Sequence, residues 1–109
     1  MIPALKTHIW APALIRRAEG AGAFAAVVKK GDPDSGTAMI KVRTLDGNAV
    51  LYRPIRNMAG DRVWLPKGPE DEREIDLYIN KQIDDDPDLW IIEVEDREGR
   101  AFLTEPIEA

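Results

Sequence analysis

The sequence predicts an α+β domain in which two helices cover a mostly antiparallel sheet, in the order α-β-β-β-(β)-α-β-β. Three observations support this class. The segment Asp84–Arg100 contains an unbroken apolar run, Leu89–Ile92, which is typical of a strand buried on both faces. Two other segments have apolar residues at helical spacing, and the segments between them alternate apolar and polar residues. We therefore expect a three-stranded meander, a helix and a C-terminal hairpin.

Length and composition limit the class of protein. The chain has 109 residues, and we expect residues 1–109 to form one domain. It has no cysteine, which excludes disulfides, thiolate nucleophiles and thiolate metal sites. No apolar run approaches the roughly 18 residues of a membrane-spanning helix. Residues 1–6 do not have the pattern of a signal peptide, so we expect a cytoplasmic protein.

The first helix is expected from Thr7, a candidate cap, to about Glu19, with Gly20 ending it. Pro12 lies within this stretch, where it removes a backbone hydrogen bond and crowds the preceding turn. The helix therefore either begins near Ala11 or is kinked at Pro12.

Three strand-like segments follow the first helix. They are residues 23–30, 37–45 and 48–55, and a turn-rich loop, Gly31–Gly36, separates the first two. Asp46-Gly47 is the favoured dipeptide of a two-residue hairpin turn, because both positions need positive φ. We expect these segments to form the meander.

The second half of the chain begins with an optional fourth strand, Arg62–Leu65, expected at an edge because prolines flank it. Gly68-Pro69 is expected to open the second helix, which ends before Pro87. Its apolar stripe follows helical spacing and comprises Ile75, Tyr78, Ile79, Gln82 and Ile83.

The apolar run after the second helix is expected to form the central strand of the sheet. Its alternation places Trp90 and Ile92 on one face, and Leu89 and Ile91 on the other. After a turn, residues 101–103 can return as a short antiparallel partner.

Charge alternation on two strands gives a further prediction. Lys41 and Arg43 lie on the polar face of one strand, and Glu93 and Glu95 on that of another. If these strands are neighbours, the four side chains form ion pairs on a solvated face.

The net charge of −5 is unevenly distributed along the chain. Residues 1–67 contain 11 basic and 5 acidic residues, whereas residues 68–109 contain 4 basic and 15 acidic residues. A basic half is compatible with anion or nucleic-acid binding. The interpretation we prefer is that the two halves pack together and partly pair.

Two clusters are candidate ligand sites. The carboxylates of Asp84, Asp85, Asp86 and Asp88 could bind a hard cation, but their spacing is not that of a known loop, and a solvated turn is the simpler interpretation. The anion-binding candidates are Arg16, Arg17, Lys41 and Arg43. We expect no metal and no cofactor.

The sequence offers little for catalysis. His8 is the single histidine and Ser35 the single serine, and neither lies in a motif of a known nucleophile. We therefore expect a protein without enzymatic activity. Trp64, with Leu65 beside it, lies in the expected edge strand and is the candidate for an interface.

Several segments together resemble a known family. They are the tryptophan-containing first helix with Arg16-Arg17, the segments GAFAAVVKKGDPDSG and LDG, and above all DPDLWIIEVEDREGR. They resemble the small alphaproteobacterial proteins grouped as domain of unknown function 1491, over nearly the whole chain. The resemblance implies a bacterial cytoplasmic domain and assigns no functional residue.

From these observations we expect a non-enzymatic interaction domain that binds a protein partner or itself as a homodimer. The alternative is a domain that binds anions or nucleic acid through its basic N-terminal half. No membrane association is expected.

Overall fold

A computed structural model describes residues 6–108, so the expectation about residues 1–6 lies almost wholly outside it. The elements in chain order are α1 (Thr7–Gly20), β1 (Phe24–Lys29), β2 (Ala38–Arg43), β3 (Asn48–Arg56), β4 (Arg62–Asp71), α2 (Glu72–Asp85) and β5 (Trp90–Glu95). The predicted α+β class is confirmed, including the optional fourth strand.

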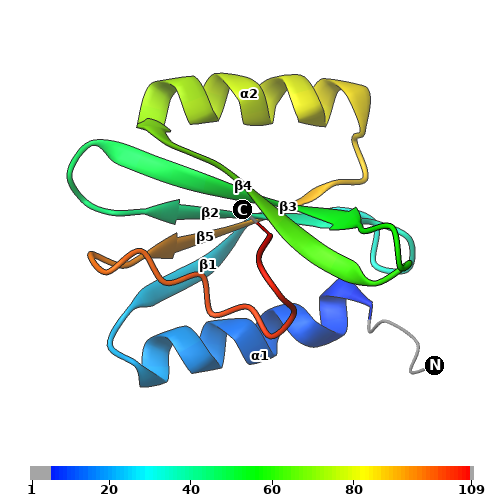
Figure 1. Ribbon diagram of the computed structural model, residues 1–109, viewed down its shortest axis with the longest axis horizontal. Helices are drawn as coiled ribbons and strands as arrows, with labels where there is room; N and C mark the ends of the chain where they lie inside the picture. Colours follow the sequence, from blue (N-terminus) through cyan, green and yellow to red (C-terminus); the bar gives the residue numbers. More distant parts are fainter. Residues whose placement is uncertain (1–5, 109) are drawn as a thin grey trace.

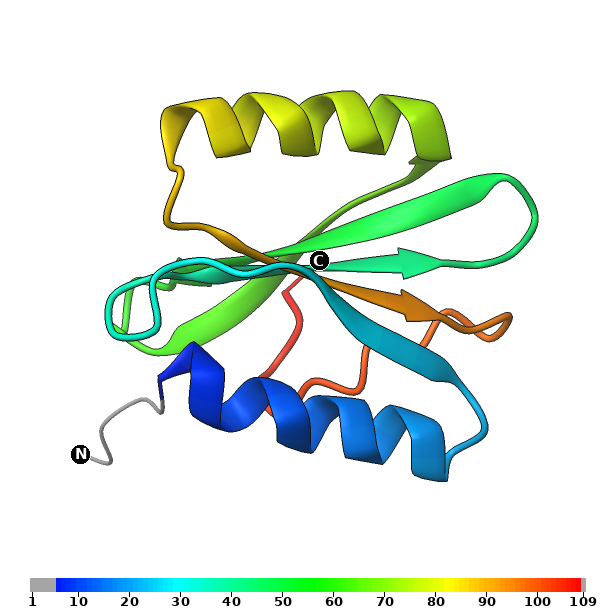
Figure 2. The same cartoon turned by 180° about the vertical axis from the view of Figure 1, so that it is seen from behind.

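The five strands form one sheet in the order β1-β5-β2-β3-β4. Strand β5 is parallel to β2, and every other pair is antiparallel. The two helices lie on opposite faces of the sheet (Figures 1 and 2). The predicted central position of the strand around Trp90 is confirmed, because β5 pairs with a strand on each side.

The strand order corrects two expectations. The meander consists of β2, β3 and β4, because β5 separates β1 from β2. The expected return strand at residues 101–103 is wrong, since these residues are irregular and Phe102 has a φ of 59°. Both edges of β5 are already paired, so no edge remains for a hairpin partner.

Each face of the sheet has its own core. On the α1 face the core includes Trp64, Trp90, Ile92 and residues of α1, and on the α2 face it includes Leu89 and Ile91. The predicted division of the apolar run between the two faces is therefore confirmed.

Helix α1 differs from the expectation at its start. Lys6 is the N-cap residue, and Thr7 Oγ1 donates to Gly36 O at 2.9 Å instead of capping the helix. Pro12 lies inside the helix, so the expected later start near Ala11 is wrong, and a kink at Pro12 stays a prediction.

Helix α2 begins later than expected, because β4 extends to Asp71 and includes Gly68-Pro69. Asp71 is the N-cap, and its carboxylate accepts from the Arg73 backbone N–H at 2.9 Å. The predicted stripe is confirmed, since Ile75 and Ile79 are buried against the sheet.

The turn between β2 and β3 is longer than the expected two residues. Thr44 N–H donates to Asn48 O, which leaves residues 45–47 as the loop. The positions with positive φ are Leu45 and Gly47, and not Asp46. Asp46 Oδ1 instead accepts from Thr44 Oγ1 and from the Asn48 backbone N–H.

Neither α1 nor α2 is long and apolar enough to cross a membrane, and residues 6–108 contain no other helix.

Candidate interaction surface

The outer edge of β1 is the sheet edge without a partner in residues 6–108. Strand β1 pairs only with β5, and no other described backbone group bonds to its outer side. Its residues Phe24 to Val28 (FAAVV) are uncharged. The side chains of Phe24 and Val28 are 61% and 54% exposed. This edge therefore has free backbone groups beside exposed apolar side chains.

The alternation of β1 explains why its apolar residues are divided between core and solvent. Ala25 and Val27 belong to the core under α1, so Phe24 points to the other face. Val28 lies where the register between β1 and β5 shifts, between Val27 and Lys29, and its side chain is exposed as well. Helix α2 covers the face to which Phe24 points over β3 and β4, and not over β1. Phe24 consequently has no helix above it.

Lysine commonly protects sheet edges by placing a charge there. In β1, however, Lys29 Nζ donates to Pro87 O at 2.8 Å and to Leu89 O at 2.9 Å. The charge is thus held at the β5 side of the strand, and it does not protect the outer edge.

An ionic cluster lies beside this surface, under the first turns of α2. Strand pairing places Lys41 opposite Glu93 and Arg43 opposite Glu95, which confirms the predicted neighbours. Arg43 Nη1 bonds to Glu95 Oε1 at 2.5 Å, and Arg43 Nε lies 3.5 Å from Glu93 Oε1. Pairing between the basic and acidic halves of the chain is therefore confirmed for these residues.

The cluster is less solvated than expected, because α2 covers part of it. Lys41 is only 6% exposed, and its Nζ donates to Glu72 Oε2 at 2.8 Å and to Asp76 Oδ1 at 2.6 Å. Burial alone would lower the pKa of Lys41, but the two hydrogen bonds and the negative charges of Glu93 and Asp76 together raise the pKa above its ordinary value. The Lys41 ammonium likewise lowers the pKa of Glu72.

The other edge of the sheet, at β4, is partly covered by the C-terminal segment, which we define as residues 96–108. Trp64 N–H donates to Pro106 O at 2.9 Å, and Glu108 N–H donates to Trp64 O at 2.8 Å. Trp64 Nε1 donates to Glu105 Oε1 at 2.8 Å. The middle of the β4 edge is therefore already paired within the chain.

This arrangement corrects the expectation for Trp64 and Leu65. Trp64 is only 1% exposed and packs edge-on against Trp10, with ring centroids 6.1 Å apart. Leu65 is half-buried. The expectation that Trp64 is exposed at an interface is therefore wrong.

The C-terminal segment is fixed at three points along its length. Asp96 accepts from Arg100 Nε and from the Arg100 backbone N–H, each at 2.8 Å. These bonds lower the pKa of Asp96 to about 2. Arg17 Nε and Nη2 donate to Phe102 O at 3.2 and 2.6 Å. The pairing with Trp64 is the third point.

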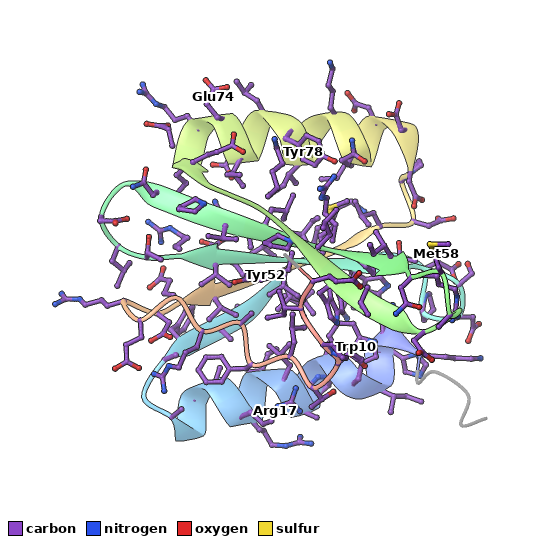
Figure 3. All side chains as sticks on the ribbon, viewed as in Figure 1. Trp10, Arg17, Tyr52, Met58, Glu74 and Tyr78 are labelled. Carbon is purple, nitrogen blue, oxygen red and sulfur yellow. The ribbon has the colours of Figure 1, made fainter. Side chains whose placement is uncertain are left out.

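The structure does not bring the four anion-binding candidates together. Arg16 and Arg17 belong to α1, whereas Lys41 and Arg43 point to the α2 side of the sheet. Figure 3 shows Arg17 on the α1 side of the sheet, opposite the side on which Tyr78 of α2 lies. Lys41 and Arg43 are also engaged by carboxylates, so an anion meets no joint basic surface there.

The aspartate run lies at the C-terminal end of α2 and just beyond it. Asp84, Asp85, Asp86 and Asp88 are all exposed, and Asp86 Oδ1 accepts from the Asp88 backbone N–H at 3.1 Å. A solvated turn is thus present at Asp86–Asp88, but Asp84 and Asp85 still belong to α2, and Arg16 and Arg17 lie on the other face of the sheet (Figure 1). Among the described residues no group of acidic or histidine side chains is arranged to hold a metal ion.

The single histidine and single serine both lie near the loop Gly31–Gly36, but they do not contact each other. His8 Nδ1 is 2.7 Å from Pro33 O, and Ser35 Oγ donates to Asp32 Oδ1 at 3.0 Å. The loop packs on β5, where Trp90 Nε1 donates to Asp32 O at 2.8 Å. A Cβ atom on Gly31 would collide with Asp88 O, so glycine is required there.

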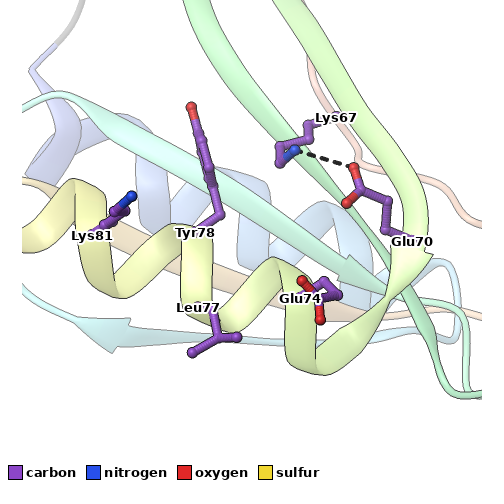
Figure 4. A pocket seen from close by; sticks show the side chains of 6 residues that line it. All are labelled: Lys67, Glu70, Glu74, Leu77, Tyr78 and Lys81. Atoms are coloured by element: carbon purple, nitrogen blue, oxygen red, sulfur yellow. Dashed lines mark ion pairs between the residues drawn. The ribbon is translucent and has the colours of Figure 1, made fainter.

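An open pocket of about 410 Å³ lies between α2 and β4 (Figure 4). Its lining residues are Lys67, Glu70, Glu74, Leu77, Tyr78 and Lys81. Lys67 Nζ lies 3.2 Å from Glu70 Oε2 and 4.9 Å from the centre of the Tyr78 ring. The charges of the lining residues are mixed and face solvent, so the pocket has no preference for one class of ligand.

The β1 edge is the feature that sequence reasoning missed. The residues Phe24–Val28 are apolar on both faces of the strand, which is the pattern of a strand covered on both sides, so the sequence does not indicate an open edge there. The prolines around Trp64 led instead to the prediction of an edge strand and an interface at β4. They do mark an edge, but the partner of that edge comes from irregular residues near Pro106 that no strand pattern predicts.

Comparisons with known proteins agree with this geometry. Residues 5–104 match the model of a family described as "Protein of unknown function (DUF1491)". A crystal structure of a DUF1491 family protein from Caulobacter crescentus is 45% identical, covers 96% of this chain and 100% of its own, and has a TM-score of 0.88. An NMR structure of a DUF1491 family protein from the same organism is 43% identical, with 99% and 100% coverage and a TM-score of 0.86.

A third structure, of a protein from A. tumefaciens, is 32% identical over 96% of this chain and 97% of its own, with a TM-score of 0.81. No curated protein matches the chain. The family match spans nearly all of the sequence and agrees with the solved structures in fold. The chain therefore belongs to the DUF1491 family.

Proposed function

We propose that this protein is an interaction domain, without catalytic activity of its own, that binds a polypeptide along the outer edge of β1. The observation that supports the proposal is the free edge of β1, where Phe24 and Val28 are exposed. An extended segment added to such an edge gains main-chain hydrogen bonds and covers the apolar side chains. The proposal needs neither a cofactor nor a metal.

The alternative of anion or nucleic-acid binding has less support. It requires several basic side chains on one surface. Lys41 is buried against Glu72 and Asp76, and Arg17 is bound to a backbone carbonyl on the far face of the sheet. We therefore retain polypeptide binding as the single proposal.

The experiment is an affinity capture from the native cytosol with three forms of the full chain. They are the wild type, Phe24→Lys/Val28→Lys, and the control Leu77→Lys/Ile9→Lys. The control adds the same charge at apolar residues of similar exposure, 62% and 50%, on the two helices. Each sample is prepared with and without nuclease.

The proposal expects a stoichiometric polypeptide that binds the wild type and the control and is lost from Phe24→Lys/Val28→Lys. Binding that disappears with nuclease would contradict it and favour the alternative. A polypeptide retained by all three forms would also contradict it, because the β1 edge would then not be the binding surface.

A further inference from the structure

We propose that the occupant of the β1 edge is the β1 edge of a second copy of this chain. The two strands pair antiparallel about a two-fold axis at Ala26. This inference rests on the proposed function, since it names the partner for the same edge. It follows from the order of residues along β1 and from the state of the other sheet edge.

The residue order of β1 is self-complementary in this register. When Ala26 of one chain lies opposite Ala26 of the other, Phe24 of the first chain lies opposite Val28 of the second. By the two-fold symmetry, Val28 of the first chain lies opposite Phe24 of the second. Directly opposite residues in an antiparallel pair share a face. The two exposed apolar side chains of each chain would therefore contact those of its partner.

The sizes of the side chains also fit. The two Ala26 side chains meet at the axis, where their small volume leaves room for the larger Phe24 and Val28 pairs on either side. Phe24 and Val28 are the residues of β1 left uncovered in the single chain. Pairing thus covers the side chains that the fold itself leaves exposed.

Electrostatics does not oppose this pairing, although each chain has a net charge of −5. The five paired residues, Phe24 to Val28, are uncharged. The charges beside them on β5 are those of Glu95, opposite Phe24, and of Glu93, opposite Ala26, and both carboxylates pair with Arg43. The charge of Lys29 is bound by the carbonyl oxygens of Pro87 and Leu89. A second β1 adds no charge of its own to this edge, because its residues Phe24 to Val28 are uncharged.

The β4 edge explains why the assembly closes at two copies. Pairing of β1 with β4 would continue from chain to chain and form an open filament. That edge is occupied at Trp64 by residues 106–108 of the same chain, and Pro66 removes a backbone donor nearby. The β1 edge is left to pair with its own copy.

The interface is small, because it comprises one six-residue strand per chain. Standard interfaces bury about 1,600 Å² in total, and smaller ones belong to transient complexes. The dimer should therefore form and dissociate with protein concentration. The sedimentation mass of the wild type should rise from one chain towards two, and that of Phe24→Lys/Val28→Lys should stay at one.

Cross-linking tests the register directly, because the chain has no cysteine. We compare three single variants of the full chain, Ala26→Cys, Val28→Cys and the control Leu77→Cys, under mild oxidation. Opposite residues have Cα atoms about 4.5–5.5 Å apart, within the reach of a disulfide. The two Val28 positions are offset by about 14 Å along the strands, which is beyond that reach.

We expect Ala26→Cys to form a covalent dimer at least ~10-fold faster than the other two variants, since only its thiols are paired in the dimer. Equal rates in Ala26→Cys and Leu77→Cys would overturn the proposal, as would faster cross-linking of Val28→Cys. If the inference fails while Phe24→Lys/Val28→Lys still loses a captured polypeptide, the proposed function stands without it. If both tests fail, both proposals fall.

Discussion

The two edges of the sheet end in different ways. At β4, Trp64 is buried and its backbone groups bond to residues 106–108 of the same chain. At β1, Phe24 and Val28 are exposed, and the outer backbone groups have no partner among residues 6–108. The chain covers the middle of one edge with its own C-terminal segment and leaves the other edge uncovered among the described residues. We therefore expect Trp64 at the β4 edge to contribute to the stability of the fold. We expect Phe24 at the β1 edge to contribute to association.

The largest expected effect is on stability at the closed edge. Trp64→Ala should lower the free energy of unfolding by about 3–5 kcal/mol, since it removes a fully buried aromatic side chain from the α1-face core. Phe24→Ala should change it by about 0.5 kcal/mol or less, as an exposed position does. Urea unfolding of both variants measures the difference. Equal losses would show that the two edges are equally packed.

The next effect concerns the hydrogen bond that joins the C-terminal segment to Trp64. Glu105→Ala leaves the Trp64 indole N–H without its partner, which should cost about 1–3 kcal/mol. Glu108→Ala is the matched control, because its exposed side chain makes no described hydrogen bond and only its backbone contacts Trp64. Urea unfolding that gives the same free energy for both variants would contradict this assignment.

A third effect depends on pH and concerns the start of the C-terminal segment. The hydrogen bonds from Arg100 lower the pKa of Asp96 from 3.8 to about 2 in the folded chain. Its carboxylate therefore stabilises the fold above about pH 4, and this contribution is lost as the pH falls towards about 2. Asp96→Asn should be less stable than the wild type at pH 7.

The stability difference between the wild type and Asp96→Asn should shrink between pH 4 and pH 2, and urea unfolding across this range measures it. Asp61→Asn, at an exposed carboxylate whose side chain makes no described hydrogen bond, is the control for the loss of one charge. A difference that stays constant across the range would contradict the role of Asp96.

The smallest effect on stability is expected at the open edge. Phe24→Lys/Val28→Lys should keep the wild-type free energy of unfolding within about 0.5 kcal/mol, because both side chains are exposed. The same variant should lose association. A variant that loses stability as well would show that these residues support the fold of the single chain.

Local pattern predicted the parts of the fold that depend on nearby residues. The apolar run at Leu89–Ile92 placed β5 centrally, because a strand apolar on both faces needs cover on both. The alternation of Lys41 with Arg43, and of Glu93 with Glu95, likewise identified the charged face of each strand, and their pairing followed on the condition that the two strands are neighbours.

The strand order could not be predicted, because it depends on contacts distant in sequence. Nothing in residues 24–29 shows that β5 lies between β1 and β2, since an uncharged strand fits either neighbour equally well. The cover over Trp64 comes from irregular backbone near Pro106. A regular spacing of apolar residues predicts helices and strands. An irregular segment that pairs with a sheet edge has no such spacing, so its position could not be predicted.

The most direct test of the difference between the two edges is amide hydrogen exchange, measured on the full chain at low and high concentration. The account predicts slow exchange of the Trp64 amide at both concentrations, because its N–H is bonded to Pro106 O. The outward-facing amides of residues 24–28 should exchange quickly in dilute protein and more slowly in concentrated protein. Outward amides of β1 that are as slow as Trp64 in dilute protein, or that do not respond to concentration, would contradict it.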